Sequence, residues 1–208
     1  MPQYTSNPPL LEADVASEPI AQFRRWFDDA TAVGMIEPAA MTLATVDADG
    51  RPSARVVLLK GLDEQGFAFY TNYGSRKARA LAANPLAAAT FWWDRLERSV
   101  RIEGVTERLT AAESEAYFRS RPQGSQVGAY TSRQSEVVAS RAELDARLAA
   151  NLAAYASAPV PFDPACWGGY RLRPEAIEFW QGRDNRSHDR LRYRRGADGG
   201  WRLERLEP

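Results

Sequence analysis

Apolar residues near the start of the chain recur every three or four positions, which is the spacing of one face of an α-helix. The stretch opens with Ser17, Glu18 and Pro19, and a proline fits the first turn of a helix. Its apolar positions are Ile20, Phe23, Phe27 and Ala30. The pattern predicts an amphipathic helix from about Ser17 to Val33 that buries one face.

Spacing and capping residues indicate further helices. Residues 75–83 form a short helical stretch that ends before Pro85, because the residue preceding a proline avoids the helical conformation. The spacing of a capping box, a hydroxyl three residues before a carboxylate, occurs at 110–113 and again at 140–143. The helix that follows the second box carries apolar residues at helical steps, at Leu144, Leu148, Leu152 and Tyr155.

Elsewhere apolar and polar residues alternate, which is typical of half-buried β-strands. Turn residues divide the first and the last alternating stretch into hairpins, at 47–52 and at 196–200. The alternating stretches are residues 41–60, 66–72, 86–94, 98–109, 167–182 and 188–206. Strands at such short intervals favour an antiparallel barrel over alternating βαβ units. We therefore predict an α+β fold, a β-barrel with peripheral helices.

The length and composition are those of one folded domain. The chain has 208 residues, of which 44% are apolar, enough to bury a core. We expect residues 1–16 to be a flexible segment and residues 17–208 a single domain. No apolar run is long enough to span a bilayer, and the N-terminus lacks the parts of a signal peptide. With one cysteine, Cys166, and one histidine, we expect a cytoplasmic protein with no metal site and no membrane partner.

The charge of the chain is balanced in amount but uneven in kind. The 27 basic residues equal the 27 acidic ones, which argues against a nucleic-acid partner. All but two of the basic residues are arginines, and the exceptions are Lys60 and Lys77. A lysine in such a chain marks either a place that needs a compact ammonium group or a chance survivor of compositional drift.

The strong signatures of nucleotide-binding loops and of serine hydrolases are absent. Instead, Arg55 and Lys60 bracket an apolar run, and Arg76 and Lys77 follow Ser75 at a helix start. Free backbone N–H groups, hydroxyls and cations at a helix N-terminus favour a phosphate. The alternative interpretation is a set of solvated charges.

A second candidate anion site combines Tyr117, Arg121 and Ser125. The first two residues are four positions apart and so share one helical face, and Ser125 follows in a turn beyond the helix end. The alternative is that the tyrosine packs on a neighbour while the arginine caps the helix.

A third cluster surrounds the only histidine. His188 lies between Arg186 and Arg190, and Trp180 precedes them. A lone histidine is usually structural, but arginines without matching acids favour an anionic ligand.

Taken together, these segments resemble pyridoxamine 5'-phosphate oxidases. The similar segments, in order, are RVVLLK, FYTNYGSRKA, YFRSRPQGSQVGA, SRQS, WGGY and EFWQGRDNRSHDR, and the resemblance runs from about residue 20 to Pro208. It implies a homodimer built on an FMN-binding split β-barrel, antiparallel and of Greek-key type, with FMN at the subunit interface. It also implies oxidation of pyridoxine 5'-phosphate or pyridoxamine 5'-phosphate to pyridoxal 5'-phosphate. Electrons pass to dioxygen to give hydrogen peroxide, and the amine substrate releases ammonia.

The resemblance also implies roles for individual residues. In one subunit FMN would be bound by Arg55, Val56, Val57, Leu58, Leu59, Lys60, Tyr70, Thr71, Arg76 and Lys77. The other subunit would complete that site with Gln134, Ser135, Trp180 and Arg190. The substrate phosphate would be bound by Lys60, Tyr117, Arg121 and Ser125. The catalytic candidates over the pyridine ring are Arg186, for orientation and electrostatics, and His188, for substrate contact and proton handling.

Three departures from the family pattern bear on the site. Ser99 stands where the family commonly has glutamine, so it is the candidate at the flavin edge. Ser187 replaces a common leucine and becomes a candidate substrate contact. Some members close an N-terminal arginine and tyrosine over the substrate, and here only Tyr4 is a candidate.

Two other functions remain open at this point. One is a related FMN oxidase of the phenazine-pathway type, which acts on a bulkier aromatic substrate. The other is a non-catalytic protein that binds FMN or pyridoxal 5'-phosphate. The set of residues suited to a substrate phosphate counts against the first, and Arg186 with His188 counts against the second.

Overall fold

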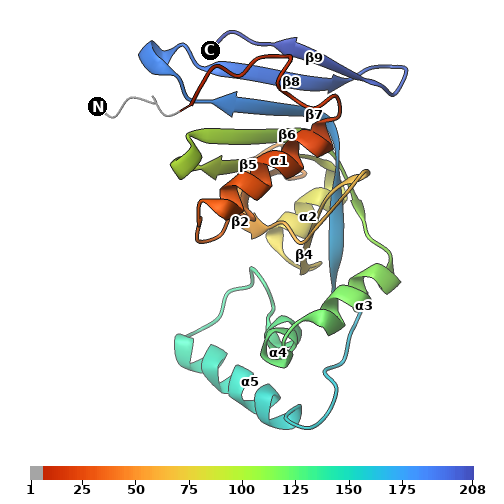
Figure 1. The fold of residues 1–208 in the computed structure, drawn as a ribbon. Helices are drawn as coiled ribbons and strands as arrows, with labels where there is room; N and C mark the ends of the chain where they lie inside the picture. The colour runs from red at the N-terminus through yellow and green to blue at the C-terminus, as the bar shows by residue number, and fades with distance from the viewer. Residues whose placement is uncertain (1–6) are drawn as a thin grey trace.

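The described part of the chain, residues 7–208 of a computed structural model, folds around one curled antiparallel sheet (Figure 1). The strands are β1 (Ala40–Val46), β2 (Pro52–Leu58), β3 (Gly61–Asp63), β4 (Gly66–Asn72), β5 (Leu86–Trp93), β6 (Arg98–Arg108), β7 (Trp167–Gln181), β8 (Asp189–Arg195) and β9 (Trp201–Arg205). Their order is β2-β1-β5-β6-β7-β4-β3, with β8 paired to β7 and β9 to β8. Every pairing is antiparallel, which confirms the predicted α+β split barrel.

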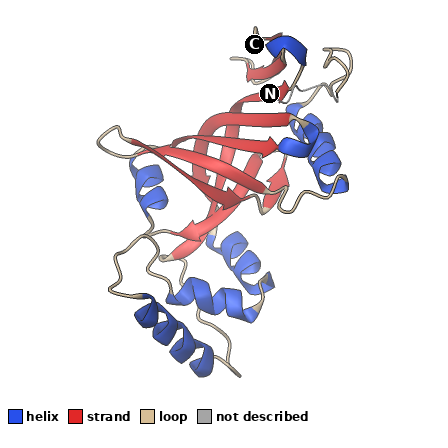
Figure 2. Ribbon diagram, turned by 90° about the vertical axis from the view of Figure 1, so that its left-hand side faces the viewer, coloured by secondary structure: helices blue, strands red, loops and turns tan. Residues whose placement is uncertain are grey.

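The helices lie outside the curl of the sheet, as predicted (Figure 2). Within residues 7–208 they are α1 (Pro19–Ala32), α2 (Arg76–Ala83), α3 (Ala111–Ser120), α4 (Gln123–Thr131), α5 (Arg141–Ala154) and the short 3₁₀ turns η1 (Asp94–Leu96) and η2 (Asp184–Arg186). Helices α3, α4 and α5 gather at one end of the molecule, opposite the end that carries β8 and β9 (Figure 1).

Helix α1 forms because its apolar positions share one face. Ile20, Phe23, Trp26 and Ala30 are buried. The ring of Phe23 meets Phe67 edge-on at 4.9 Å and Phe91 at 5.0 Å, between ring centroids. These contacts join the helix to the main hydrophobic core, and burial of such rings contributes about 1.5–3 kcal/mol each.

Both predicted N-cap residues cap their helices, and the first forms the full capping box. Thr110 and Glu113 form a reciprocal capping box at the start of α3. The Ser140 hydroxyl accepts a hydrogen bond from the backbone N–H of Glu143 at the start of α5 (3.2 Å). A cap of this kind contributes about 1 kcal/mol.

The turn predicted around Ser125 is wrong, because Ser125 lies in the first turn of α4. Its N–H donates to the carbonyl of Pro122 (2.8 Å), and Pro122 is the N-cap of that helix. Tertiary packing explains the difference. Val127 of α4 is buried in a second hydrophobic cluster with Phe118 and Trp167, and this contact outweighs the turn character of the local sequence.

Residues 7–16 run along the C-terminal strands. The N–H of Leu10 donates to Asp189 (2.9 Å), and the side chain of Gln181 donates to the carbonyl of Pro8 (2.7 Å). Glu12 pairs with Arg205 at 2.8 Å. The flexibility expected for residues 1–16 stays a prediction, and Tyr4 lies outside the described residues.

Candidate functional site

The edge strand β2 presents Arg55 with its guanidinium fixed by neutral oxygens. Nη1 donates to the Leu43 carbonyl (3.0 Å) and the Thr45 hydroxyl (2.9 Å), and Nη2 donates to the Ser53 hydroxyl (2.6 Å). Burial lowers the pKa of Arg55, and the nearby charge of Arg76 adds to this effect. The guanidinium is thus fixed in place, and no carboxylate of the described chain forms an ion pair with it.

Lys77 lies in the first turn of α2, the helix that Ser75 caps. Its Nζ donates to the Thr71 hydroxyl (3.1 Å) and to Oε1 of Gln134 (2.8 Å). Burial, and secondarily the charge of Arg55, lowers the pKa of Lys77 to about 8. Both acceptors are neutral, so an anionic oxygen would be a stronger partner for this ammonium group.

Gln134 and Ser135 lie beside Lys77 and Arg76 of the same chain. In addition to the Gln134 contact with Lys77, the backbone N–H of Arg76 donates to the Ser135 hydroxyl (3.1 Å). We expected these two residues to reach the site from the other subunit, whereas the structure places them beside Lys77 and Arg76 within one chain. The segment after α4 folds back onto the start of α2, an arrangement that residue spacing along the chain does not reveal.

A cavity of about 390 Å³ opens beside Lys77. Ten of its lining residues were named in the sequence analysis as candidates for binding FMN or the substrate: Val56, Val57, Leu58, Lys60, Tyr70, Thr71, Lys77, Tyr117, Arg121 and Gln134. Within the described chain its lining contains three cations, Lys60, Lys77 and Arg121, and no carboxylate. Of the other candidates, Leu59 is buried in the core, and Ser125 is exposed on α4 outside the lining.

Arg121 and Tyr117 form the wall of the cavity nearest α3. The Nη1 atom of Arg121 is buried and has no hydrogen-bond partner among residues 7–208. Burial lowers the pKa of Arg121 and raises that of Tyr117. The Tyr117 ring stacks on Tyr70 with 3.8 Å between ring centroids. A buried unpaired N–H is costly, so this arginine is suited to an anion that would accept from it.

Ser99, Trp180 and Arg190 form a second group elsewhere on the sheet. Ser99 of β6 pairs with Trp180 of β7, which pairs with Arg190 of β8, so the three are neighbours across adjacent strands. All three line another cavity, of about 590 Å³, together with Glu178. Glu178 accepts from Nε of Arg190 at 2.8 Å and from Nη2 of Arg101 at 2.6 Å, so it positions both guanidinium groups.

The catalytic candidates follow this second group on the turn between β7 and β8. Arg186 is exposed at the end of η2 with a left-handed φ of 61°, and Ser187 is exposed beside it. Nδ1 of His188 accepts from the backbone N–H of Arg183 (3.1 Å), and its ring lies 4.7 Å from Trp180 between centroids. When the imidazole is neutral, its proton is therefore on Nε2.

One chain does not bring the two groups together. The cavity with Lys77 and Arg121 and the cavity with Trp180 and Arg190 share no lining residue. Each chain thus carries two separate sets of predicted site residues.

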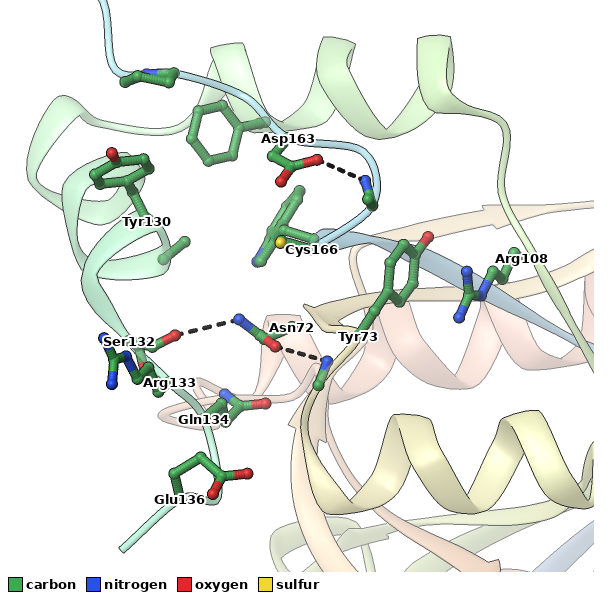
Figure 3. Close-up of a pocket in the computed structure, with 16 residues that line it drawn as sticks. Asn72, Tyr73, Arg108, Tyr130, Ser132, Arg133, Gln134, Glu136, Asp163 and Cys166 are labelled. Atoms are coloured by element: carbon green, nitrogen blue, oxygen red, sulfur yellow. Dashed lines mark hydrogen bonds between the residues drawn. The ribbon is translucent and has the colours of Figure 1, made fainter. Parts of the chain in front are cut away.

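Trp167, Asn72 and Ser132 also line the 390 Å³ cavity, and they were missed as site residues. They line the adjoining cavity of about 600 Å³ as well, in which Figure 3 shows Asn72 and Ser132. Asn72 holds the two segments together there, because its side chain donates to the carbonyl of Ser132 (3.2 Å). The WGGY segment was the available signal for Trp167, since it was part of the resemblance without a role.

Comparisons with known proteins agree with this architecture. Residues 27–152 match the family model described as pyridoxamine 5'-phosphate oxidase. Residues 167–208 match the model described as the pyridoxine 5'-phosphate oxidase C-terminal dimerisation region. Residues 7–208 contain no helix with the length and apolar character needed to cross a membrane.

Curated relatives are similar over nearly their whole length. A pyridoxine/pyridoxamine 5'-phosphate oxidase of Thermosynechococcus vestitus is 61% identical and aligns with 96% of this chain and 93% of its own. A pyridoxine/pyridoxamine 5'-phosphate oxidase of Pseudomonas paraeruginosa is 58% identical and aligns with 99% of this chain and 95% of its own. Among solved structures, PhzG from Burkholderia lata, in complex with tetrahydrophenazine-1-carboxylic acid, has a TM-score of 0.91 at 32% identity, covering 99% of this chain and 100% of that one.

The curled sheet, its outer helices and the cation-lined cavity define a protein of the FMN-binding split-barrel class. Within that class, the chain belongs to the pyridoxamine 5'-phosphate oxidase family, a family of oxidoreductases.

Proposed function

We propose that this chain oxidises pyridoxine 5'-phosphate or pyridoxamine 5'-phosphate to pyridoxal 5'-phosphate, with dioxygen as electron acceptor and hydrogen peroxide as product. The amine substrate would release ammonia. The observation that carries the proposal is the 390 Å³ cavity, whose described lining has three cations and no carboxylate. The buried Nη1 of Arg121, which has no hydrogen-bond partner in the described part of the chain, supplies a donor for a phosphate oxygen. Names of the curated relatives support the same substrates.

FMN fits the residues around the start of α2. Arg55, Arg76 and Lys77 would hold its phosphate, since both described acceptors of the Lys77 ammonium group are neutral and the dipole at the N-terminus of α2 favours an anion. When bound, FMN supplies the acceptor for a hydride equivalent and passes the electrons to dioxygen. The chain's own task is to hold the substrate in a reactive orientation, which can contribute several kcal/mol to the rate.

We place FMN at the interface of a homodimer. The two groups of site residues lie apart in one chain, and the C-terminal region matches a dimerisation region, so a twofold-symmetric pair would let each subunit complete the other's site. In this arrangement Trp180 and Arg190 of one subunit face the FMN held by Lys77 of its partner. Arg186 orients the substrate and stabilises charge, while His188 presents Nε2 to it.

Anaerobic mixing tests the reaction. Pyridoxine 5'-phosphate added to the yellow holoprotein without oxygen is expected to bleach the flavin, and air is expected to restore the colour with release of peroxide. A spectrum that does not change would refute the oxidase activity and favour a binding protein. The cytoplasmic location expected from the single cysteine belongs to this proposal.

The similarity to PhzG supports a second candidate, oxidation of a reduced phenazine carboxylate. Because the cations of the cavity would also suit a carboxylate, the kinetics of pyridoxine 5'-phosphate and of a reduced phenazine carboxylate are measured in parallel. The cation set predicts a much higher kcat/KM for pyridoxine 5'-phosphate, and the reverse order would assign the chain to the second function.

Subunit mixing tests the shared site. Lys77→Met damages one group and Arg190→Ala the other, so each homodimer has two impaired sites. A mixed dimer has one site with both groups intact, and a random mixture is expected to recover about a quarter of the wild-type FMN binding and activity. No recovery on mixing would mean that the two groups serve the same subunit's site.

A further inference from the structure

Three aromatic rings stand nearly parallel on the wall of the 390 Å³ cavity. Tyr70, Tyr117 and Trp167 come from β4, α3 and β7. Tyr117 lies at 19° to Tyr70 and at 6° to Trp167, with 3.8 Å and 6.2 Å between ring centroids. Trp167 is only 9% exposed and is anchored in the second hydrophobic cluster. The stack is thus fixed at its Trp167 end.

The guanidinium of Arg121 lies over the same indole. Its Cζ is 5.1 Å from the centroid of the Trp167 ring and 6.0 Å from that of Phe118. Among the described residues Arg121 has no carboxylate within ion-pair distance, and Nη1 has no hydrogen-bond partner. A cation–π contact holds a guanidinium by its flat face and leaves the N–H groups on its edge available.

We infer that Trp167 is a positioning residue for the phosphate end of the substrate site. Its ring holds the Arg121 guanidinium and supports the Tyr70 ring, on which Tyr117 stacks, without occupying the donors that a phosphate needs. A carboxylate partner would hold the arginine equally well but would compete with the phosphate for the same N–H groups. The inference rests on the proposed function, and it explains why a cation buried in this wall has aromatic rather than acidic neighbours.

The test compares Trp167→Leu with Phe162→Leu in the holoprotein. Phe162 contacts Trp167 and Phe118 in the same cluster, and no cation–π contact joins it to Arg121, so it reports the cost of core damage alone. We expect Trp167→Leu to raise KM for pyridoxine 5'-phosphate, and Kd for pyridoxal 5'-phosphate, about tenfold, because a desolvated cation–π contact has about that effect. The value of kcat and the FMN content should stay within about twofold, because the reacting end of the site is unchanged.

Two additional variants keep the result interpretable if Trp167→Leu folds poorly. Trp167→Phe keeps an aromatic face and is expected to raise KM about threefold, since phenylalanine is the weaker cation–π partner. In a double-mutant cycle, Trp167→Phe is expected to add nothing to the effect of Arg121→Ala, because the ring acts through that arginine.

The experiments distinguish a failure of the positioning role of Trp167 from a failure of the proposed function. Equal KM in Trp167→Leu and Phe162→Leu, or additive effects in the cycle, would overturn the positioning role and leave the proposed function standing. A wild-type protein that oxidises pyridoxine as readily as its 5'-phosphate would overturn both.

Discussion

The ammonium group of Lys77 lies 2.8 Å from Oε1 of Gln134, so its nearest partner is a neutral amide. Because burial and the charge of Arg55 lower the pKa of Lys77 to about 8, this lysine loses its proton within a readily studied pH range. A bound phosphate favours the charged form. Lys77 is therefore expected to take up a proton when FMN binds at alkaline pH.

The first prediction concerns the affinity for FMN. Above about pH 8 the unliganded lysine is neutral, so Kd for FMN is expected to rise by up to about tenfold per pH unit until the pKa of the complex is reached. Titration of the apoprotein by flavin fluorescence between pH 7 and 10 measures the slope. Lys77→Met should bind weakly and show no such slope, and a slope that persists in this variant would assign the titration to another group.

The second prediction concerns the stability of the apoprotein. Burial holds the folded-state pKa of Lys77 at about 8, below the 10.5 of an ordinary lysine side chain. At pH values between these two, folding must therefore release a proton from Lys77. The resulting destabilisation is fully present below about pH 8 and disappears as the pH rises toward 10.5. Wild-type protein is thus expected to gain stability over this range relative to Lys77→Met in urea unfolding at matched pH. A constant difference would mean that Lys77 is solvated in the apoprotein.

Much of the fold follows from the sequence because its signals are local. Helix α1 was predictable from four apolar positions, and α3 and α5 from their caps. The exception, α4, reads as a turn because Pro122 and Gly124 start it. It is helical because Val127 packs into a cluster built by distant residues, and such tertiary contacts are not visible in a window of sequence.

Ten residues that line the 390 Å³ cavity were named from the sequence, but the position of Gln134 and Ser135 beside Lys77 and Arg76 of the same chain was not predicted. Ser99, Trp180 and Arg190 become neighbours only through the register of β6, β7 and β8, with an irregularity after Glu103. Register depends on the whole sheet. Glu178 was overlooked for the same reason, since its role appears only when its arginine partners lie on adjacent strands.

A third prediction concerns Glu178. Its side chain is 7% exposed and accepts from both Arg190 and Arg101, so Glu178→Gln leaves two cations poorly compensated. We expect a loss of about 2 kcal/mol of stability by urea unfolding, with weaker FMN binding because Arg190 is displaced. Glu103→Gln is the matched control: its side chain is 56% exposed and also pairs with Arg101 (3.2 Å), so it should cost less than about 0.5 kcal/mol. Equal effects of the two variants would contradict the positioning of Arg190 by Glu178.

The fourth prediction concerns a close approach at Gly169 of β7. A Cβ atom there would lie 2.5 Å from Leu109 Cδ1 and 2.9 Å from Tyr70 Cε1. Gly169→Ala must therefore move the Tyr70 ring, and we expect a loss of about 1–3 kcal/mol of stability together with a higher KM. Gly128→Ala on α4 meets nothing within 4 Å and is expected to stabilise by about 0.5–1 kcal/mol. Thermal unfolding and substrate kinetics of the two variants give the comparison, and an unaltered KM in Gly169→Ala would separate this packing from the site.

The last prediction separates catalysis from cofactor binding at Arg186. This residue is exposed, and its left-handed φ of 61° costs an ordinary residue about 1–2 kcal/mol, so the turn is strained at Arg186. Arg186→Ala is expected to lower kcat/KM by about 100-fold, since the proposed function assigns this side chain to the orientation of the substrate. FMN content should be unchanged, because Arg186 lines neither described cavity.

A backbone control completes this experiment. Arg186→Gly removes the same side chain and relieves the strained φ, so it should be as inactive as Arg186→Ala and more stable in thermal unfolding. Arg186→Lys keeps the charge but loses the planar fork, and it should recover only part of the rate. If Arg186→Ala turns over nearly as fast as the wild type, the arginine has no part in catalysis. In that case His188 is the next candidate for orienting the substrate, because the hydrogen bond from the Arg183 N–H to its Nδ1 fixes the ring.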